Sequence, residues 1–147
     1  MNSKVKCLVQ VPAQTKWASV ALLLLRLVVG IAFILHGFGK IQNPFGWMPP
    51  GSPVPGFFQF LAALSEFGGG IALVLGLLTR LGSLGIAITM AVATCMHAFV
   101  LHDPFVNLTG GGAFELPFVY MMIAILFISM GPGKFSADDK VFGNSSC

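Results

Sequence analysis

The stretch that decides the fold is LSEFGGGIALVLGLLTRL at residues 64–81. It is apolar over a length that can cross a bilayer, yet it carries a carboxylate, Glu66, near one end and Arg80 near the other. A charged side chain at the centre of a membrane helix costs at least about 2.5 kcal/mol, so such residues usually face the interior of a helix bundle and carry a function. Glu66 is therefore the first candidate functional residue.

The whole chain has the composition of a membrane protein. Of its 147 residues, 56% are hydrophobic and only 9% are charged, whereas soluble domains average about 25% charged residues. The net charge of +3 is small and forms no basic block, which argues against nucleic acid as a partner. The three cysteines lie far apart, so they indicate neither a disulfide framework nor a zinc site. The lipid bilayer is the expected partner.

Four apolar segments predict an all-α, four-helix transmembrane bundle, because about 20 helical residues cross about 30 Å of hydrocarbon. The predicted helices cover residues 17–41, 57–79, 82–101 and 114–130, within a transmembrane domain at residues 17–133. The first long loop holds five of the nine prolines, and a very short turn at Arg80 and Gly82 separates the second and third helices. Residues 1–16 and 134–147 form polar tails, and the C-terminal tail is expected to be mobile.

Positive charge is distributed very unevenly between the two ends of this bundle. With four spans, one end holds Lys4, Lys6, Lys16, Arg80, Lys134 and Lys140, and the other holds only Lys40. Because cytoplasmic loops are enriched in lysine and arginine, the N- and C-termini are both expected in the cytoplasm. Arg26, two turns inside the first helix, is expected to be a snorkelling or structural residue.

The polar residues inside the helices are predicted to meet at one depth. A helical rise of about 1.5 Å per residue places Glu66, His97 and His36 roughly 21 to 25 Å from the cytoplasmic end. Lys40 lies one turn beyond His36, and Glu115 opens the fourth helix from the outer side. These five residues are therefore expected to form a single layer near the outer leaflet.

Such a layer can exchange protons, because it combines histidines with a buried carboxylate. Glu66, His97 and His36 are the candidate catalytic residues, and Lys40 can stabilise an anionic group. A pocket for an aromatic, hydrophobic ligand such as a quinone is expected beside four aromatic side chains, namely Phe33, Phe60, Phe67 and Phe99.

Each of these residues also has a purely structural explanation. A histidine can be a hydrogen-bonded core residue, Lys40 can anchor its helix at the membrane surface, and Glu115 can interact with the helix dipole. A metal ion is the alternative occupant of the layer, with His36, Glu66, His97 and Glu115 as competent ligands. No Walker, Rossmann, haem-attachment or serine-nucleophile motif is present.

Several segments together resemble the DoxX family of small four-helix membrane proteins. They are RLVVGIAFILHGFGKI at 26–41, LSEFGGGIALVLGLLTRLGSL at 64–84, MAVATCMHAF at 90–99, GGGAFELPFVYM at 111–122 and GPGKFSADD at 131–139. The resemblance implies a multi-pass protein of the cytoplasmic (inner) membrane, linked to quinone-coupled sulfur oxidation as in thiosulfate:quinone oxidoreductase, or to oxidoreductase complexes with partner subunits. By position, the recurrent polar residues of the family fall on His36, Lys40, Glu66, His97 and Glu115.

These observations favour a quinone-linked membrane oxidoreductase, or the membrane subunit of one. Quinone binding is assigned to His36, Lys40, Glu66, His97 and Glu115. The alternative is a non-catalytic membrane anchor or assembly partner, in which the polar layer only fixes the register of the helices. A third hypothesis is a conduit for small solutes. Glycine-rich helix faces are also compatible with a homodimer.

Overall fold

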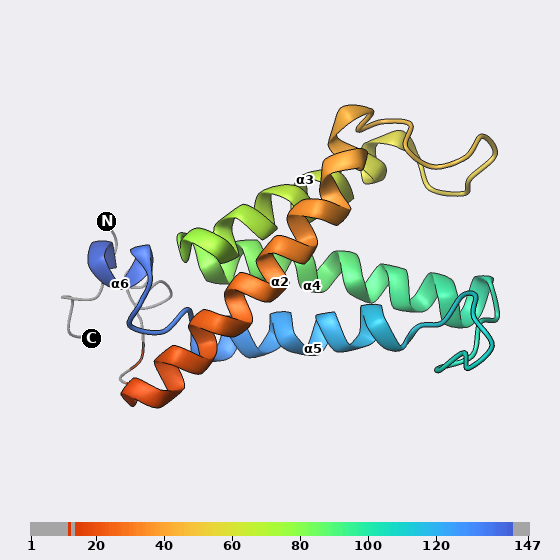
Figure 1. Ribbon diagram of the computed structural model, residues 1–147. Helices are drawn as coiled ribbons and strands as arrows, with labels where there is room; N and C mark the ends of the chain where they lie inside the picture. Colours follow the sequence, from red (N-terminus) through yellow and green to blue (C-terminus); the bar gives the residue numbers. More distant parts are fainter. Residues whose placement is uncertain (1–11, 13, 143–147) are drawn as a thin grey trace.

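The computed structural model describes residue 12 and residues 14–142, and within that part of the chain all regular structure is helical (Figure 1). The long helices are α2 (Lys16–Gln42), α3 (Gly56–Leu75), α4 (Thr79–Cys95) and α5 (Glu115–Met130). A π-helical segment, η1 (Met96–Val100), continues α4, and the short α6 (Ala137–Phe142) follows α5. The prediction of an all-α protein is confirmed.

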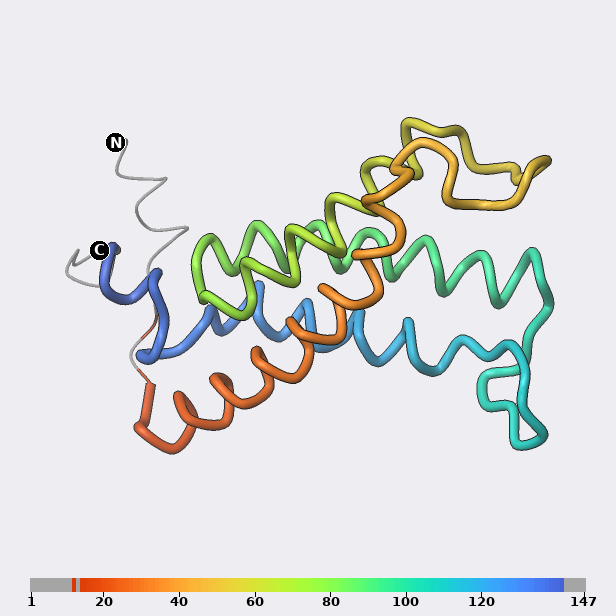
Figure 2. The backbone as a smooth tube through the Cα atoms, turned by 45° about the horizontal axis from the view of Figure 1, so that its top comes forward, coloured from red at the N-terminus to blue at the C-terminus, as the bar shows by residue number. Residues whose placement is uncertain are grey.

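The long helices pack against one another in chain order. α3 lies against both α2 and α4, and α5 lies against α4. Loops 43–55 and 101–114 emerge at one end of the bundle, termed the loop end, while α6 and the start of α2 lie at the opposite, terminal end (Figures 1 and 2). Towards the loop end, the α2–α3 pair diverges from the α4–α5 pair in both views.

The bundle has a small core and a large apolar surface. Nine apolar side chains form the core: Leu22, Val29, Phe33, Leu73, Ile86, Ala87, Met90, Ala124 and Phe127. Many other large apolar side chains on the same helices are exposed, which marks a surface that contacts membrane lipid. Three helical stretches, Lys16–Gln42, Gly56–Leu75 and Thr79–Val100, are long and apolar enough to cross a membrane, and α5 is apolar but shorter. The protein is therefore a multi-pass membrane protein.

The turn between α3 and α4 lies earlier in the chain than predicted. α3 ends at Leu75 because Gly76 adopts a left-handed conformation with φ of 64°, which glycine reaches without steric cost. Leu78 is also left-handed, with φ of 50°, and α4 begins at Thr79. Arg80 and Gly82, which were predicted to form the turn, therefore lie inside α4.

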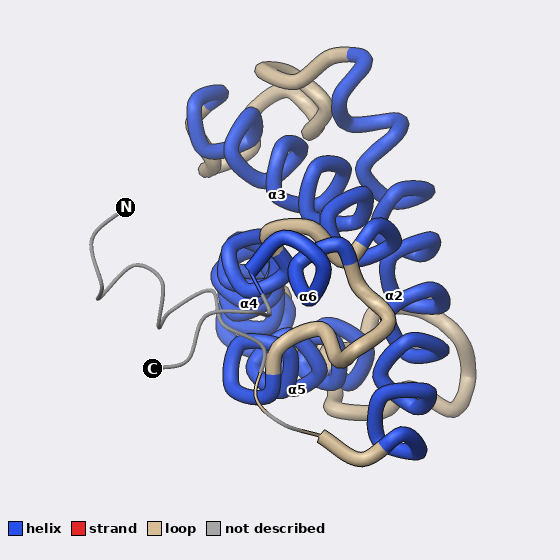
Figure 3. The backbone as a smooth tube through the Cα atoms, turned by 90° about the vertical axis from the view of Figure 1, so that its left-hand side faces the viewer, coloured by secondary structure: helices blue, strands red, loops and turns tan. Residues whose placement is uncertain are grey.

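The segment after α5, residues 131–141, is docked on the bundle and is termed the C-terminal latch. The prediction of a mobile tail from Lys134 onward is therefore wrong for residues 134–141. Arg26 of α2 is almost fully buried and donates hydrogen bonds to the carbonyl oxygens of Pro132 (3.0 Å) and Phe135 (3.1 Å). Arg26 is thus a structural residue that holds the latch. Seen from the terminal end, α6 lies across the end of α4 (Figure 3).

Asp138 of the latch caps the start of α4. Its carboxylate accepts hydrogen bonds from the backbone N–H groups of Leu78 (2.7 Å) and Thr79 (3.0 Å). Its own N–H donates to the carbonyl of Gly76 at 2.8 Å. Asp138 is buried and close enough to interact with the charge of Arg26. The terminal half of the bundle therefore contains a buried ionic group contributed by the tail, which was not predicted.

Only part of the glycine triplet mediates close helix packing. A Cβ on Gly70 would lie 2.7 Å from the backbone nitrogen of Ile34 and 2.8 Å from the carbonyl oxygen of Gly30, both in α2. Similarly, a Cβ on Gly69 would lie 3.0 Å from the carbonyl oxygen of Gly82 in α4. Gly68 has space for a side chain, because the atom nearest to a Cβ there would be a flexible leucine methyl group at 3.7 Å.

Alanine substitutions in the triplet are expected to have opposite effects. Gly70→Ala should lower the unfolding free energy by about 1 to 3 kcal/mol, because backbone atoms of α2 would have to move. Gly68→Ala should be neutral or stabilising by up to about 1 kcal/mol, because alanine favours the helix and meets open space. Thermal unfolding in detergent would measure both; an equal loss of stability would contradict the α2–α3 packing described above.

Candidate functional site

Lys40 of α2 and Glu66 of α3 form an ion pair at the loop end. The Lys40 ammonium donates to both carboxylate oxygens of Glu66, at 2.6 and 2.7 Å. The Glu66 side chain is only 3% exposed, and that of Lys40 is 25% exposed. A nearly buried carboxylate is strongly disfavoured without a partner. The ion pair therefore compensates the charge of Glu66, and Lys40 is the member of the pair that solvent or a ligand can reach.

Close contact between α2 and α3 sets the register of this pair. A Cβ on Gly37 would lie 2.5 Å from the backbone nitrogen of Phe67, so the two helices touch at these positions. Lys40 is one turn after Gly37, and Glu66 is adjacent to Phe67. The glycine therefore allows the approach that brings the ammonium onto the carboxylate.

The proline-rich loop 43–55 covers the ion pair. The Lys40 ammonium lies 4.5 Å from the centre of the Trp47 ring, a cation–π distance. The Trp47 indole N–H donates to the carbonyl of Gln59 at 2.9 Å. The Gln59 side chain, itself buried, accepts from the Met48 N–H (3.0 Å) and donates to the Val54 carbonyl (2.9 Å). Gln59 thus fastens both halves of the loop.

Gln59 has a signal in the sequence that was not used. It is a polar amide within the first turn of an otherwise apolar helix, directly after a loop rich in proline. Trp47 is likewise absent from the predicted site residues. Its contact with Lys40 depends on how the loop folds back, which spacing along the chain does not reveal.

His97 and Asp103 form a second pair, on η1 and the loop that follows. His97 Nδ1 lies 2.7 Å from Asp103 Oδ2, and the Asp103 N–H donates to the His97 carbonyl at 2.9 Å. A carboxylate at Nδ1 favours the proton on that nitrogen and leaves Nε2 to act as a base or acceptor. Asp103 therefore orients His97, as partner groups orient catalytic histidines.

The backbone around His97 is specialised to hold this pair. His97 lies in the π-helical segment η1, and π-helical turns are rare and frequent at functional sites. His102 has a left-handed φ of 56°, which turns the chain back towards His97. Gly112 packs on the Asp103 carboxylate, since a Cβ there would lie 2.6 Å from its Cγ. The glycine-rich loop thus makes room for Asp103.

The five predicted site residues are not gathered into a single layer. Lys40 and Glu66 meet between α2 and α3, whereas His97 pairs with Asp103 beyond α4. His36 and Glu115 are exposed and join neither pair. The α2–α3 and α4–α5 pairs diverge at this end (Figure 1), so residues at a similar depth lie on different sides of the bundle.

The alternative metal set is not assembled either. Across residue 12 and residues 14–142, no three side chains of histidine, cysteine, aspartate or glutamate come close enough to hold a metal ion. His36, Glu66, His97 and Glu115 therefore do not form the four-ligand site that their predicted depth suggested.

The four phenylalanines predicted to line one pocket also separate. Phe33 is buried against Tyr120, with ring centres 5.0 Å apart, and Phe60 stacks on Phe45 at 5.1 Å. Phe67 faces Phe38 at 6.4 Å. Phe99 lines a hollow that is formed by α4 and η1.

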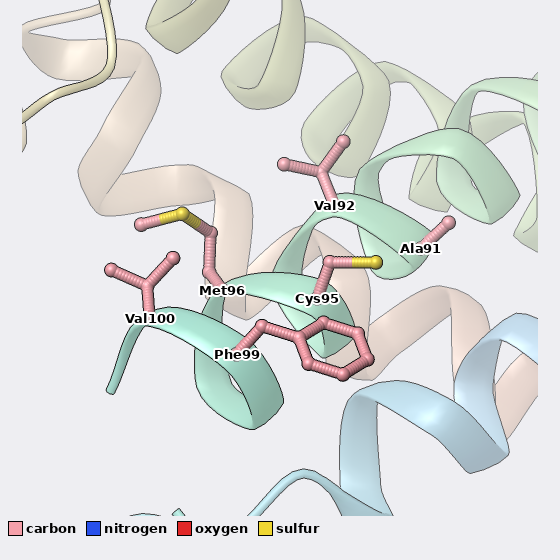
Figure 4. Close-up of a pocket in the computed structure, with 6 residues that line it drawn as sticks. All are labelled: Ala91, Val92, Cys95, Met96, Phe99 and Val100. Atoms are coloured by element: carbon pink, nitrogen blue, oxygen red, sulfur yellow. The ribbon is translucent and has the colours of Figure 1, made fainter. Parts of the chain in front are cut away.

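This hollow is shallow, apolar and open to the surroundings. It has a volume of about 360 Å³ and is lined by Ala91, Val92, Cys95, Met96, Phe99 and Val100 (Figure 4). These residues come from consecutive turns that end within η1, the segment that carries His97. A lipid-soluble molecule on this surface would meet hydrocarbon and sulfur atoms before any charged group.

The chain matches the DoxX family over residues 21–103. It is 35% identical over 135 residues to "Inner membrane protein YqjF" of Escherichia coli, which covers 84% of this chain and 93% of the relative. It is 31% identical over 129 residues to an uncharacterised protein of Haemophilus influenzae, covering 86% and 95%. It is 27% identical over 122 residues to "Putative oxidoreductase CatD" of Bacillus subtilis, covering 82% and 86%.

No solved structure gives a significant match to the chain. The family match covers more than half of the sequence and includes Lys40, Glu66, His97 and Asp103. Together with the apolar helices, these similarities show that the chain is a multi-pass membrane protein belonging to the DoxX family.

Proposed function

We propose that the protein is a quinone-linked membrane oxidoreductase, or the membrane subunit of one, with its site at the loop end. The observation that carries the proposal is the His97–Asp103 pair at 2.7 Å, whose histidine lies on the π-helical segment that also lines part of an apolar, lipid-facing hollow. A quinone needs a proton-exchanging group next to a hydrophobic surface, and this segment offers both. The relative named as an oxidoreductase supports the same class of function.

In the proposed reaction, a quinone accepts two electrons and two protons and becomes a quinol. The electrons come from a donor substrate or from a partner subunit, which is oxidised. His97 in its imidazolium form, held through Nδ1 by Asp103, gives its Nε2 proton to one quinone oxygen and becomes neutral. The second proton comes from water at the loop end, while the Lys40 ammonium stays protonated and contributes positive charge on the α2–α3 side. His36 and Glu115, both exposed at the loop end, complete the proposed polar contacts.

The proposed topology follows from the positive-inside bias. Four helices cross the membrane in this proposal, and both termini lie in the cytoplasm. The loop end, with both polar pairs, then faces the outer leaflet.

The test is quinone binding by the full chain in nanodiscs, measured by titration with a short-chain quinone. His97→Asn is expected to weaken binding about tenfold, because losing a hydrogen bond from a polar group costs about 1.4 kcal/mol. His102→Asn is the matched control, since His102 is an exposed histidine in the next loop and asparagine tolerates its left-handed backbone. Absence of quinone binding, or equal binding by both variants, would refute the proposal.

The second candidate is a non-catalytic anchor or assembly partner for an oxidoreductase complex. One observation favours it: Lys40 and Glu66 satisfy each other and tie α2 to α3, as a register-fixing pair would. In this case Glu66→Gln lowers the stability and yield of the protein. The activity of an assembled partner, normalised to the amount of complex, stays unchanged.

A further inference from the structure

We infer that loop 101–114 lies in the interface of the bilayer, with Phe105, Val106 and Leu108 inserted among the lipid chains of the leaflet at the loop end. The partner of this surface is the lipid itself. The inference concerns where the loop sits and does not depend on the proposed reaction.

The unequal lengths of α4–η1 and α5 carry the first step. Residues Thr79–Val100 form 22 residues of continuous helix and rise roughly 33 Å, whereas the 16 residues of α5 rise roughly 24 Å. At the terminal end, a Cβ on Gly131, just after α5, would lie 3.7 Å from the guanidinium group of Arg80, which belongs to the first turn of α4. The helical rises differ by roughly 9 Å, and α5 ends before η1 at the loop end in both views (Figures 1 and 2).

The shortfall means that the loop begins below the surface of the hydrocarbon. α5 is shorter than the approximately 20 residues that cross about 30 Å. The chain between η1 and α5 folds beside the end of η1, as Figure 1 shows. Loop residues thus occupy the depth that a longer α5 would have filled.

The side chains of the loop fit this depth. From Pro104 to Phe114 no residue is charged. Leu108 is 93% exposed, and Phe105 and Val106 are exposed as well. This apolar surface continues the exposed, lipid-facing residues of the flanking helices, among them Phe99, Val100, Leu116, Phe118 and Val119. In water the exposed apolar side chains of this tip would be unfavourable and would promote aggregation. In lipid the same side chains are stabilised because their apolar area is removed from water.

The backbone of the loop is also suited to a poorly hydrated environment. The N–H groups of Phe114 and Glu115 donate to the carbonyls of Pro104 (3.3 Å) and Phe105 (3.0 Å). At the tip, the Asn107 side chain accepts from Thr109 and donates to the Gly112 carbonyl at 3.3 Å. Irregular backbone near hydrocarbon is tolerated when its polar groups are paired in this way.

Loop 43–55 provides an internal contrast. Its tip consists of Pro49, Pro50, Gly51 and Pro53, all exposed and without large apolar side chains. Of its two aromatic residues, both before the tip, Trp47 lies over the Lys40 ammonium and Phe45, although exposed, stacks on Phe60. We therefore place this tip in water, which makes it a matched control within the same protein.

Tryptophan reporters test the inference in the full chain. With Trp17 and Trp47 replaced by phenylalanine, Leu108→Trp and Pro50→Trp each place one tryptophan at a loop tip. In vesicles of lipids brominated on the acyl chains, the reporter at 108 should lose most of its fluorescence and resist aqueous iodide. The reporter at 50 should show the reverse. Quenching of both by iodide, or of the reporter at 108 by neither agent, would overturn the inference.

A second measurement does not rely on a bulky reporter or on the loss of Trp47. Leu108→Cys and Pro50→Cys are compared in a chain that keeps Trp47 and has its three native cysteines, Cys7, Cys95 and Cys147, replaced by alanine. The measurement is reaction with a membrane-impermeant maleimide in sealed vesicles. The cysteine at 108 should react much more slowly than the cysteine at 50. Equal rates would place both tips in water and contradict the immersion of loop 101–114.

Discussion

Lys40→Met is expected to reduce the unfolding free energy by about 3 to 5 kcal/mol, the usual cost of removing one partner of a buried ion pair. The reason is that Glu66, 3% exposed, would keep its burial and lose the ammonium that contacts both of its oxygens. The cation–π contact with Trp47 would be lost as well. Unfolding in detergent, followed by circular dichroism, measures the loss.

Glu66→Gln is the control for this prediction and should cost clearly less. The Lys40 side chain is 25% exposed, so its ammonium can reach water after the carboxylate is removed. The double variant Lys40→Met/Glu66→Gln should be more stable than Lys40→Met alone, because no uncompensated charge remains buried. If both single variants lost the same unfolding free energy, the buried charge of Glu66 would not need compensation by Lys40.

Asp138→Ala is expected to cost about 2 to 4 kcal/mol, because two interactions disappear together. The first is the cap of α4, in which the carboxylate accepts from the N–H groups of Leu78 and Thr79. The second is the negative charge near buried Arg26. The latch should then release, so that residues 131–141 become accessible to limited proteolysis.

Asp139→Ala is the matched control, since it removes the same charge from the neighbouring position. Asp139 is half-buried, and its backbone N–H, which the substitution retains, binds Ser136 Oγ at 3.1 Å. Stability and proteolysis should stay close to those of the unaltered protein. If Asp139→Ala released the latch as readily as Asp138→Ala, the cap on α4 would not be what holds it.

The helices themselves were largely predictable, because a membrane helix is encoded by local apolarity. The stretch at residues 17–41 matches α2 within one residue at each end, and 114–130 matches α5 equally well. The errors lie at the α3–α4 turn. There the start of α4 is capped by Asp138, a residue 60 positions beyond Leu78, and no local pattern contains that contact.

The site was predictable in depth but not in its contacts. Helical rise placed Lys40 and Glu66 at a similar level, and they do meet. The same rise could not show on which side of the bundle His36 or His97 faces, because that depends on the rotation and tilt of each helix. His97 instead takes its partner, Asp103, from a loop whose path is set by the left-handed His102 and by Gly112.

Apolar periodicity and charge were thus sufficient to specify a helical membrane protein with a polar loop end, because the cost of placing each residue in lipid is local. The pairing of Lys40 with Glu66, of His97 with Asp103 and of the latch with Arg26 required the folded bundle. Each of these contacts joins residues from different elements, and hydrogen bonds act only over a few ångströms. Their partners are therefore selected by helix packing and loop geometry, which the linear spacing of residues does not encode.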